Sequence, residues 1–242
     1  MDMDLDPNLQ LRLRERPPGP SLMRHKWRDL TFLHYSVDPQ VIQTLIPPEL
    51  TVDTFGGRAW VGLVPFWMTG VRMSFLPAIP GTHTFPETNV RTYVHRDGND
   101  PGVWFFSLDA ANSLAVWGAR KFFGLPYFRA DMELEHNAGL RYESRRRGSS
   151  AGYNIQIQVG GVVPVPEPGT LEFFLVERYL LYSQHRGRIV TGMVHHEPYS
   201  LFHASKERCV ETLLEANGLS AQAWEHVCYS PGVDVEVFAV RK

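Results

Sequence analysis

Cysteine is scarce in this sequence: Cys209 and Cys228 are the two among 242 residues. Two cysteines are too few for a disulfide scaffold, and neither has a nearby Cys or His at the spacing of a structural zinc site, so buried, unreactive thiols are expected. A long hydrophobic run is lacking as well, because none approaches the ~18 residues of a membrane-spanning helix. The first residues, 1–6, are acidic where a signal peptide would be basic. These absences predict a cytoplasmic protein without a membrane partner.

An excess of charge of one sign is also lacking. Lys and Arg number 24 and Asp and Glu number 26, which gives no electrostatic reason to expect a nucleic-acid partner. The basic cluster at Arg141 and 145–147 runs into Gly148 and two serines, and it is typical of a solvated hairpin end. The sequence has no HExxH, Walker loop, GxGxxG after a strand or GxSxG elbow, which excludes the commonest hydrolase, nucleotide and dinucleotide sites.

Histidines are present but do not form a metal motif. His195 and His196 are adjacent, and neighbouring residues on a strand point to opposite faces, so without a bulge both cannot bind one metal together with His185 or His203. We expect neither a metal nor a cofactor.

Residues 1–24 mix charge with the run Pro17-Pro18-Gly19-Pro20 and show no apolar period. Such a segment cannot bury enough surface to offset the entropy of ordering it. We therefore predict a flexible N-terminal arm over 1–24 and one domain over 25–242, because no linker or repeat follows.

From Trp27 onward the chain consists of short apolar or alternating runs separated by Gly and Pro. Runs of this kind predict β-strands. The expected strands are 30–35, 59–68, 88–95, 103–108, 127–135, 153–159, 171–183, 188–195 and 233–240. The pattern favours an α+β protein that is predominantly antiparallel β, with a curved sheet or closed barrel and a few short helices.

Helices are expected in three places. Asp38 and Pro39 supply an N-cap and a first-turn proline for a helix over 41–46. A second helix, 112–123, ends at Gly124, which suits a left-handed residue. A third is expected over 204–216, before Asn217 and Gly218.

Four runs resemble a known superfamily. The stretches WGARKFFGLPYF at 117–128 and FPETNVRTYV at 85–94 are similar to two active-site segments of acetoacetate decarboxylases. With PGVWFFSLDA at 101–110 and ERY at 177–179, they resemble more closely a YqjF-like family of unknown function within the acetoacetate decarboxylase-like superfamily. The resemblance covers most of the chain after Trp27, and it implies the same fold and a small-molecule cavity. It also implies a homodimer, because members of the superfamily commonly associate.

The same resemblance removes the decarboxylase chemistry. Glu87 matches the family's active-site glutamate, and Pro126 matches the proline before its paired lysines, but Tyr127 and Phe128 stand where those lysines belong. A lysine forms the imine with the ketone, and a phenol cannot. The chain is therefore not expected to be a lysine-imine acetoacetate decarboxylase. Whether Lys121 reaches the cavity is open.

Five residues are candidates for the site. Glu87 and Tyr127 are the candidate proton-transfer groups, and Arg91, Tyr93 and Arg120 are candidates for binding an anion or a carbonyl group. Each has a structural alternative: an Arg–Glu pair that stabilises the sheet, a bond from Arg120 to a sheet carbonyl, and a tyrosine that fills the space of a lysine.

Two functions remain open at this point. One is an enzyme that acts on a small oxo-acid or carbonyl compound without a Schiff-base lysine. The other is a non-catalytic protein that keeps the superfamily cavity to bind a ligand. In both, the expected partner is a small molecule that is anionic or bears a carbonyl group.

Overall fold

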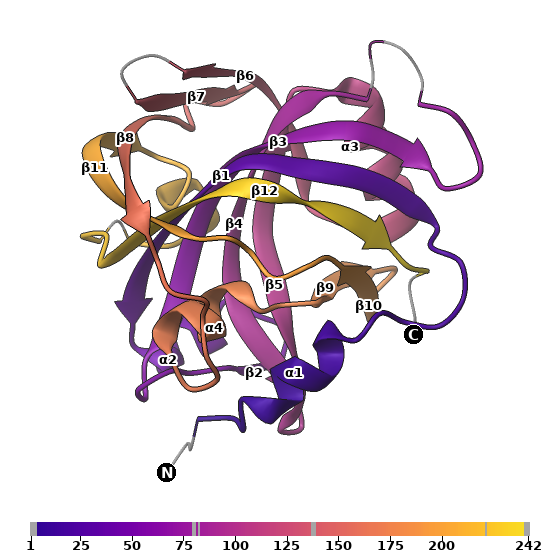
Figure 1. Cartoon of the computed structure of the whole chain (residues 1–242), viewed down its shortest axis with the longest axis vertical. Coiled ribbons are helices and arrows are strands. Elements are labelled where there is room, and N and C mark those ends of the chain that lie inside the picture. Colours follow the sequence, from indigo (N-terminus) through magenta and orange to yellow (C-terminus); the bar gives the residue numbers. More distant parts are fainter. Residues whose placement is uncertain (1–3, 79–80, 82, 137–138, 221, 240–242) are drawn as a thin grey trace.

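One large β-sheet dominates the computed structural model, which describes residues 4–78, 81, 83–136, 139–220 and 222–239 (Figure 1). Twelve strands form this sheet in the described residues. They are β1 (Met23–Val37), β2 (Thr51–Val52), β3 (Ala59–Met73), β4 (Phe85–Arg96), β5 (Asn99–Ala110), β6 (Tyr127–His136), β7 (Leu140–Arg146), β8 (Gly152–Val162), β9 (Leu180–His185), β10 (Arg188–His195), β11 (Phe202–Glu211) and β12 (His226–Val237). The fold class expected from the sequence is confirmed.

The helical segments are short. They are α1 (Asn8–Arg14), α2 (Pro39–Gln43), α3 (Ser113–Gly118), the π-helical turn η1 (Ala119–Phe123), α4 (Leu171–Val176) and the 3₁₀ turn η2 (Glu215–Asn217). The side-chain oxygen of Asn112 caps α3 by accepting hydrogen bonds from two backbone N–H groups. Gly124 ends η1 in the left-handed region, as the sequence predicts. Within the described residues, no helix has the length and apolar character needed to cross a membrane.

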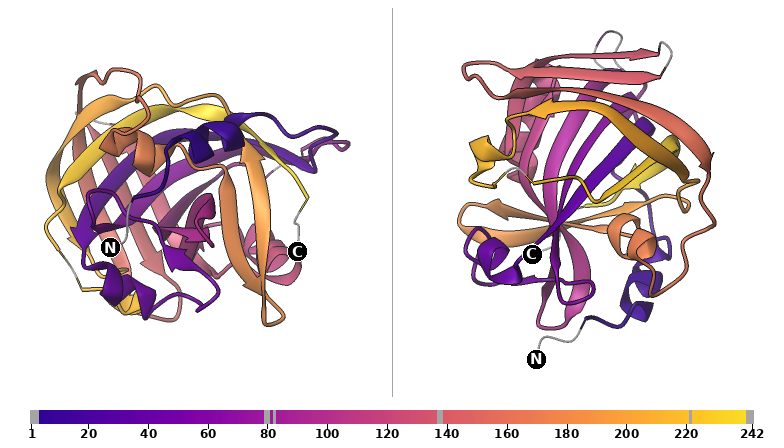
Figure 2. Two further views of the ribbon diagram at one scale, coloured as in Figure 1. Left: turned by 90° about the horizontal axis from the view of Figure 1, so that it is seen from below. Right: turned by 90° about the vertical axis from the view of Figure 1, so that its left-hand side faces the viewer.

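The sheet curves into an uneven ring that branches at β5 (Figure 2). β12, β1, β3, β4 and β5 lie side by side through antiparallel ladders. One edge of β5 is divided between two parallel partners, β9 at residues 102–104 and β6 at residues 108–110. β12 likewise pairs with β11 and, near its end, with β10. The five shared strands therefore form a wall between a smaller ring closed by β9 and β10 and a larger one closed by β6, β7, β8 and β11.

This shared wall explains why β3 is apolar without alternation. Leu63 belongs to a hydrophobic cluster that also contains Tyr142 and Ile155 of the larger ring. Its neighbour Val64 belongs to a second cluster, which contains Val194 of β10. Because successive side chains of a strand point to opposite faces, a strand buried on both faces is apolar throughout.

Within the segment expected to be a flexible arm, residues 8–14 form α1. α1 lies against the end of α4, where the buried side-chain amide of Gln10 donates to the carbonyl of Glu177 at 3.1 Å. Arg14 forms an ion pair of 2.9 Å with the Glu177 carboxylate, which is 2% exposed. The polar contacts of these two side chains order a segment that has little apolar surface of its own.

Three local expectations were wrong. The segment expected to be a helix over 204–216 is mostly strand β11, which pairs with β8. The strand expected over 171–183 begins instead as α4, because the Thr170 hydroxyl caps its first turn. In the basic hairpin, Arg146 is buried and forms a bidentate pair with Asp109.

Candidate functional site

A cavity of about 370 Å³ lies inside the smaller ring. The alternation of β4 brings Glu87, Asn89 and Arg91 to its wall, since these three residues share one face of the strand. Tyr127 and Arg178 complete the main polar part of the lining. Most of the remaining lining is aliphatic or aromatic. A mostly apolar cavity with a few converging polar groups is the usual form of a small-molecule site.

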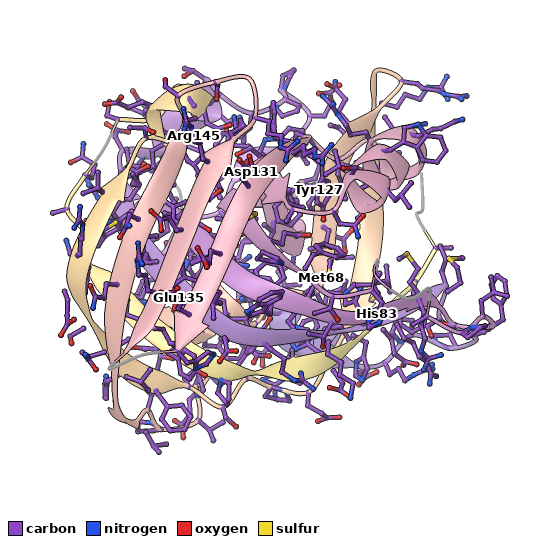
Figure 3. The ribbon with its side chains drawn as sticks, turned by 90° about the horizontal axis from the view of Figure 1, so that it is seen from above. Met68, His83, Tyr127, Asp131, Glu135 and Arg145 are labelled. Atoms are coloured by element: carbon purple, nitrogen blue, oxygen red, sulfur yellow. The ribbon has the colours of Figure 1, made fainter. Side chains whose placement is uncertain are left out.

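Glu87 and Tyr127 form a hydrogen-bonded pair in this cavity. The Tyr127 hydroxyl donates to Oε2 of Glu87 at 2.8 Å, and both residues are buried, with exposures of 6% and 3%. Tyr127 begins β6, directly after the helical segment formed by α3 and η1 (Figure 3). It reaches Glu87 because β6 pairs with β5, and β5 pairs with β4.

Burial raises the pKa of the Glu87 carboxyl to about 8. The hydrogen bond from Tyr127 opposes this rise, and the negative charge of Asp109 adds to it. Burial and the neighbouring Glu87 also raise the pKa of Tyr127 well above its usual value, so the phenol remains a hydrogen-bond donor. Glu87 is therefore a carboxyl group that gains or loses its proton near neutral pH, as a general acid or base requires.

Arg91 supplies a positive charge on the same wall. Its Nη2 donates to the Tyr93 hydroxyl at 3.3 Å and to the Leu175 carbonyl at 3.2 Å, and its guanidinium lies 5.5 Å from the centre of the Phe32 ring. Within the described residues, Arg91 has no carboxylate within 4.0 Å, and its buried Nε has no hydrogen-bond partner. A partly buried guanidinium without a counter-ion is a natural site for an anion.

Arg178, which the sequence reasoning did not select, also lines the cavity. It follows α4, and its Nη1 pairs with Asp53 at 2.6 Å, with both side chains at most 3% exposed. Its Nε donates to the Phe174 carbonyl at 2.8 Å, while Nη2 has no partner among the described residues. The buried Oδ1 of Asn89 is likewise without a partner there. Unpaired buried groups of this kind are costly unless a ligand or water completes them.

Tyr93 lies on the same face of β4, one alternation beyond Arg91. Its hydroxyl donates to the Leu175 carbonyl at 2.9 Å and lies 2.7 Å from Nε2 of His34. Arg91 donates to the same hydroxyl, so Tyr93 fixes the position of the guanidinium, although it is not among the described residues that line the cavity.

Arg120 does not join the others. It is exposed and lies, with Lys121 and Arg129, along a surface depression beside α3. Lys121 is also exposed, and its Nζ lies 4.8 Å from the centre of the Trp117 ring. Glu87, Arg91 and Tyr127 therefore line one cavity, Tyr93 contacts Arg91, and Arg120 lies outside.

The described residues contain no group of three His, Cys, Asp or Glu side chains arranged to hold a metal ion. The two adjacent histidines have separate environments. Nδ1 of His195 lies 3.1 Å from the Arg14 carbonyl, and His196 is buried with its Nδ1 2.8 Å from the Glu197 carbonyl. Nothing in the polar lining of the cavity is a typical cofactor-binding motif.

Comparison with known sequences gives one family. The sequence model of the family DUF2071, described as an uncharacterized conserved protein, matches residues 24–234. The chain is 39% identical over 229 residues to the uncharacterized protein YqjF of Bacillus subtilis strain 168, a match that covers 93% of this chain and 94% of YqjF.

Solved structures share the fold at low sequence identity. The enduracididine biosynthesis enzyme MppR complexed with pyruvate has a TM-score of 0.67 at 14% identity, covering 94% of this chain and 92% of MppR. The acetoacetate decarboxylase of Legionella pneumophila has a TM-score of 0.61 at 13% identity and covers 94% of both chains. The fold is therefore similar to that of acetoacetate decarboxylase-like proteins, as the sequence motifs predict.

Proposed function

We propose that this chain, which belongs to the DUF2071 family, binds a carbonyl-bearing organic anion in its cavity and moves a proton on it through Glu87, without forming an imine. One observation carries the proposal. A carboxyl group with a pKa of about 8 lies in the same cavity as Arg91, a guanidinium that has no carboxylate partner among the described residues. A similar fold in a protein described as complexed with pyruvate supports an oxo-acid as the ligand class.

The chemistry needs no group that the cavity lacks. Above about pH 8 the Glu87 carboxylate removes a proton from a carbon next to the ligand's carbonyl group. The C–H bond breaks, its proton goes to the carboxylate oxygen, and its electron pair moves to the carbonyl oxygen as an enolate. Returning the proton regenerates both ligand and carboxylate. Tyr127 holds the carboxyl group in place and stabilises its charged form.

The positions of the lysines support a mechanism without an imine. The sequence contains four, Lys26, Lys121, Lys206 and Lys242. The first three are exposed, and none of them lines the cavity, while Lys242 lies outside the described residues. At the position where the resemblance places the imine-forming lysine, this chain has Tyr127.

Proton exchange tests the proposal directly. Glu87 and Arg91 are four residues apart on β4, about 13 Å at ~3.3 Å per residue, so the carbonyl group must be some distance from the carboxylate. We would follow the loss of C–H signals by NMR in D2O for 4-oxopentanoate, 6-oxoheptanoate and 8-oxononanoate. We expect faster exchange for at least one of them, with a rate that rises through a midpoint near pH 8. Glu87→Gln should reduce that rate by about 10²-fold or more, as for loss of a general base.

Arg91→Met should weaken binding of the anions but not of neutral 2-butanone, which tests the charge separately. Arg145→Met removes an exposed guanidinium from β7, on the outer face of the sheet away from the cavity, and is the matched control (Figure 3). Exchange that persists in Glu87→Gln would contradict the proposed role.

A non-catalytic binding protein is the second candidate, and the absence of a lysine among the described residues of the cavity lining favours it. It predicts that oxo-acids bind in an Arg91-dependent manner by calorimetry while their C–H protons exchange no faster than in buffer. Both candidates therefore predict Arg91-dependent binding of oxo-acids, but only the enzyme predicts accelerated exchange of their C–H protons.

A further inference from the structure

We infer that the natural ligand is an elongated amphipathic anion, with its carboxylate at Arg91 and a hydrocarbon body that fills the cavity toward an apolar mouth. The anionic end rests on the proposed function. The hydrocarbon body rests on independent features of the cavity: its volume, the distribution of its polar groups and the residues at its opening.

The volume exceeds what a small oxo-acid needs. The cavity of about 370 Å³ has room for on the order of twelve non-hydrogen atoms, at the ~30 Å³ that one water molecule occupies in the liquid. Pyruvate has about six non-hydrogen atoms, so by the same measure it would fill at most about half of this space. A tightly bound ligand leaves little empty apolar volume, because empty space forfeits dispersion contacts.

The ionisable groups of the proposed site lie on or beside one strand. Glu87, Asn89 and Arg91 form a stripe along β4, with Tyr127 and Arg178 beside it. The rest of the lining is mostly apolar and comes from several strands, for example Val64 of β3 and Val194 of β10. His25 of β1, Ser183 of β9 and Tyr199 are separate polar side chains within it. A ligand that matches this lining has one polar side or end and a large hydrocarbon surface.

The stripe also has a direction. In the β3–β4 ladder, Arg91 lies opposite Gly62 and Glu87 lies opposite Phe66, and β3 then continues to Met73. Glu87 is therefore nearer than Arg91 to the Met73 end. At ~3.3 Å per strand residue, the Cα atoms of Glu87 and Arg91 are ~13 Å apart. The Arg91 guanidinium bonds to the hydroxyl of Tyr93, farther along β4 from Glu87.

The mouth lies at the Met73 end. Met23, Val71, Met73 and Leu114 line the cavity and are themselves partly or fully exposed, with Leu114 at 64%. None of these four side chains carries a charge, and methionine adapts its shape to varied apolar ligands. A hydrocarbon chain entering here would pass Glu87 and end with its carboxylate at Arg91.

A chain-length series tests this inference. Binding of butanoate, hexanoate, octanoate and decanoate to the full chain would be measured by calorimetry. We expect affinity to rise about threefold to fourfold per methylene, as for burial of a CH₂ group. Equal affinity across the series, with binding still lost in Arg91→Met, would overturn the inference and leave the proposed anion site standing. A failure of every acid of the series to bind would also overturn the inference, and the proposed function would be overturned only if the oxo-acids failed to bind as well.

A paired substitution places the tail. Ala115 lines the cavity from α3, whereas Ser113 on the same helix is exposed and does not line it. Ala115→Trp should weaken decanoate binding at least tenfold and leave butanoate unchanged, and Ser113→Trp should change neither. Decanoate binding that tolerates Ala115→Trp would contradict the proposed path of the tail. The series on the unmodified chain remains decisive if that variant does not fold.

Discussion

Between pH 4.5 and about 8, the Glu87 carboxyl takes up a proton when the chain folds, so the free energy of unfolding depends on pH. Its pKa is about 8 in the folded protein, against the ordinary glutamate value of 4.5, which applies to the unfolded chain. The folded state therefore binds more protons than the unfolded state in this window. Stability is highest below pH 4.5, as far as this group is concerned, and is lost as pH rises toward 8. Glu87→Gln replaces the carboxyl with a neutral group of similar shape and should remove this dependence.

The size of the effect follows from the two pKa values. The difference between about 8 and 4.5 sets an upper limit of about 5 kcal/mol above pH 8, at 1.36 kcal/mol per pKa unit. Between pH 5 and pH 7 the same values give a loss of about 2.5 kcal/mol for the unmodified chain relative to Glu87→Gln.

Urea denaturation at pH 5, 6, 7 and 8 measures this difference. The free energy of unfolding of Glu87→Gln minus that of the unmodified chain should increase by about 2.5 kcal/mol from pH 5 to pH 7. Buried histidines such as His25 and His196 titrate in both proteins, so their contribution cancels in the difference. Glu133→Gln, on the exposed face of β6, controls for the loss of one carboxyl group. A difference that stays constant across these pH values would refute a raised pKa at Glu87.

Three further outcomes are expected. Tyr127→Phe removes a hydrogen bond that favours charged Glu87, so the pH midpoint of proton exchange should move upward by about one unit, and an unchanged or lower midpoint would contradict the pairing. Deleting residues 1–15 removes the cation that pairs with buried Glu177 and should lower the free energy of unfolding by about 2 to 4 kcal/mol, whereas an unchanged melting temperature would show that α1 contributes nothing. Acetoacetate with borohydride should leave no reduced adduct on any lysine by mass spectrometry, and an adduct at Lys121 would contradict its exposed position.

Much of the sheet could be predicted because its signal is local. The runs at 59–68 and 88–95 lie within β3 and β4. The predicted cap at Asp38 begins α2, and the predicted end at Gly124 follows η1. The failure at 204–216 has a tertiary cause. Ala204 and its neighbours favour a helix by propensity, but their backbone groups pair with β8 and close the larger ring. No local pattern encodes that partner.

The site was predictable where a residue sits on a regular strand. Glu87 and Arg91 share the face of β4 that alternation assigns to them. Arg120 was misplaced because the helical pattern could not show which face of the α3–η1 segment would cover the sheet. Arg178 was missed because its role depends on Asp53, which is 125 residues away in the chain. Long-range ion pairs leave no spacing signal in a single sequence.

In the wall shared by the two rings, the two faces of each strand have different tasks: one lines the ligand cavity and the other packs the larger ring. Along β3, substitutions at Val64 or Phe66 reshape the ligand space, while those at Val61 or Leu63 act on the packing of the other ring. A protein built this way can exchange one ligand for another through every second residue of a strand, while the alternate residues keep the fold intact. Substitutions on one face of β3 can therefore change the ligand, while the residues on the opposite face continue to pack the larger ring.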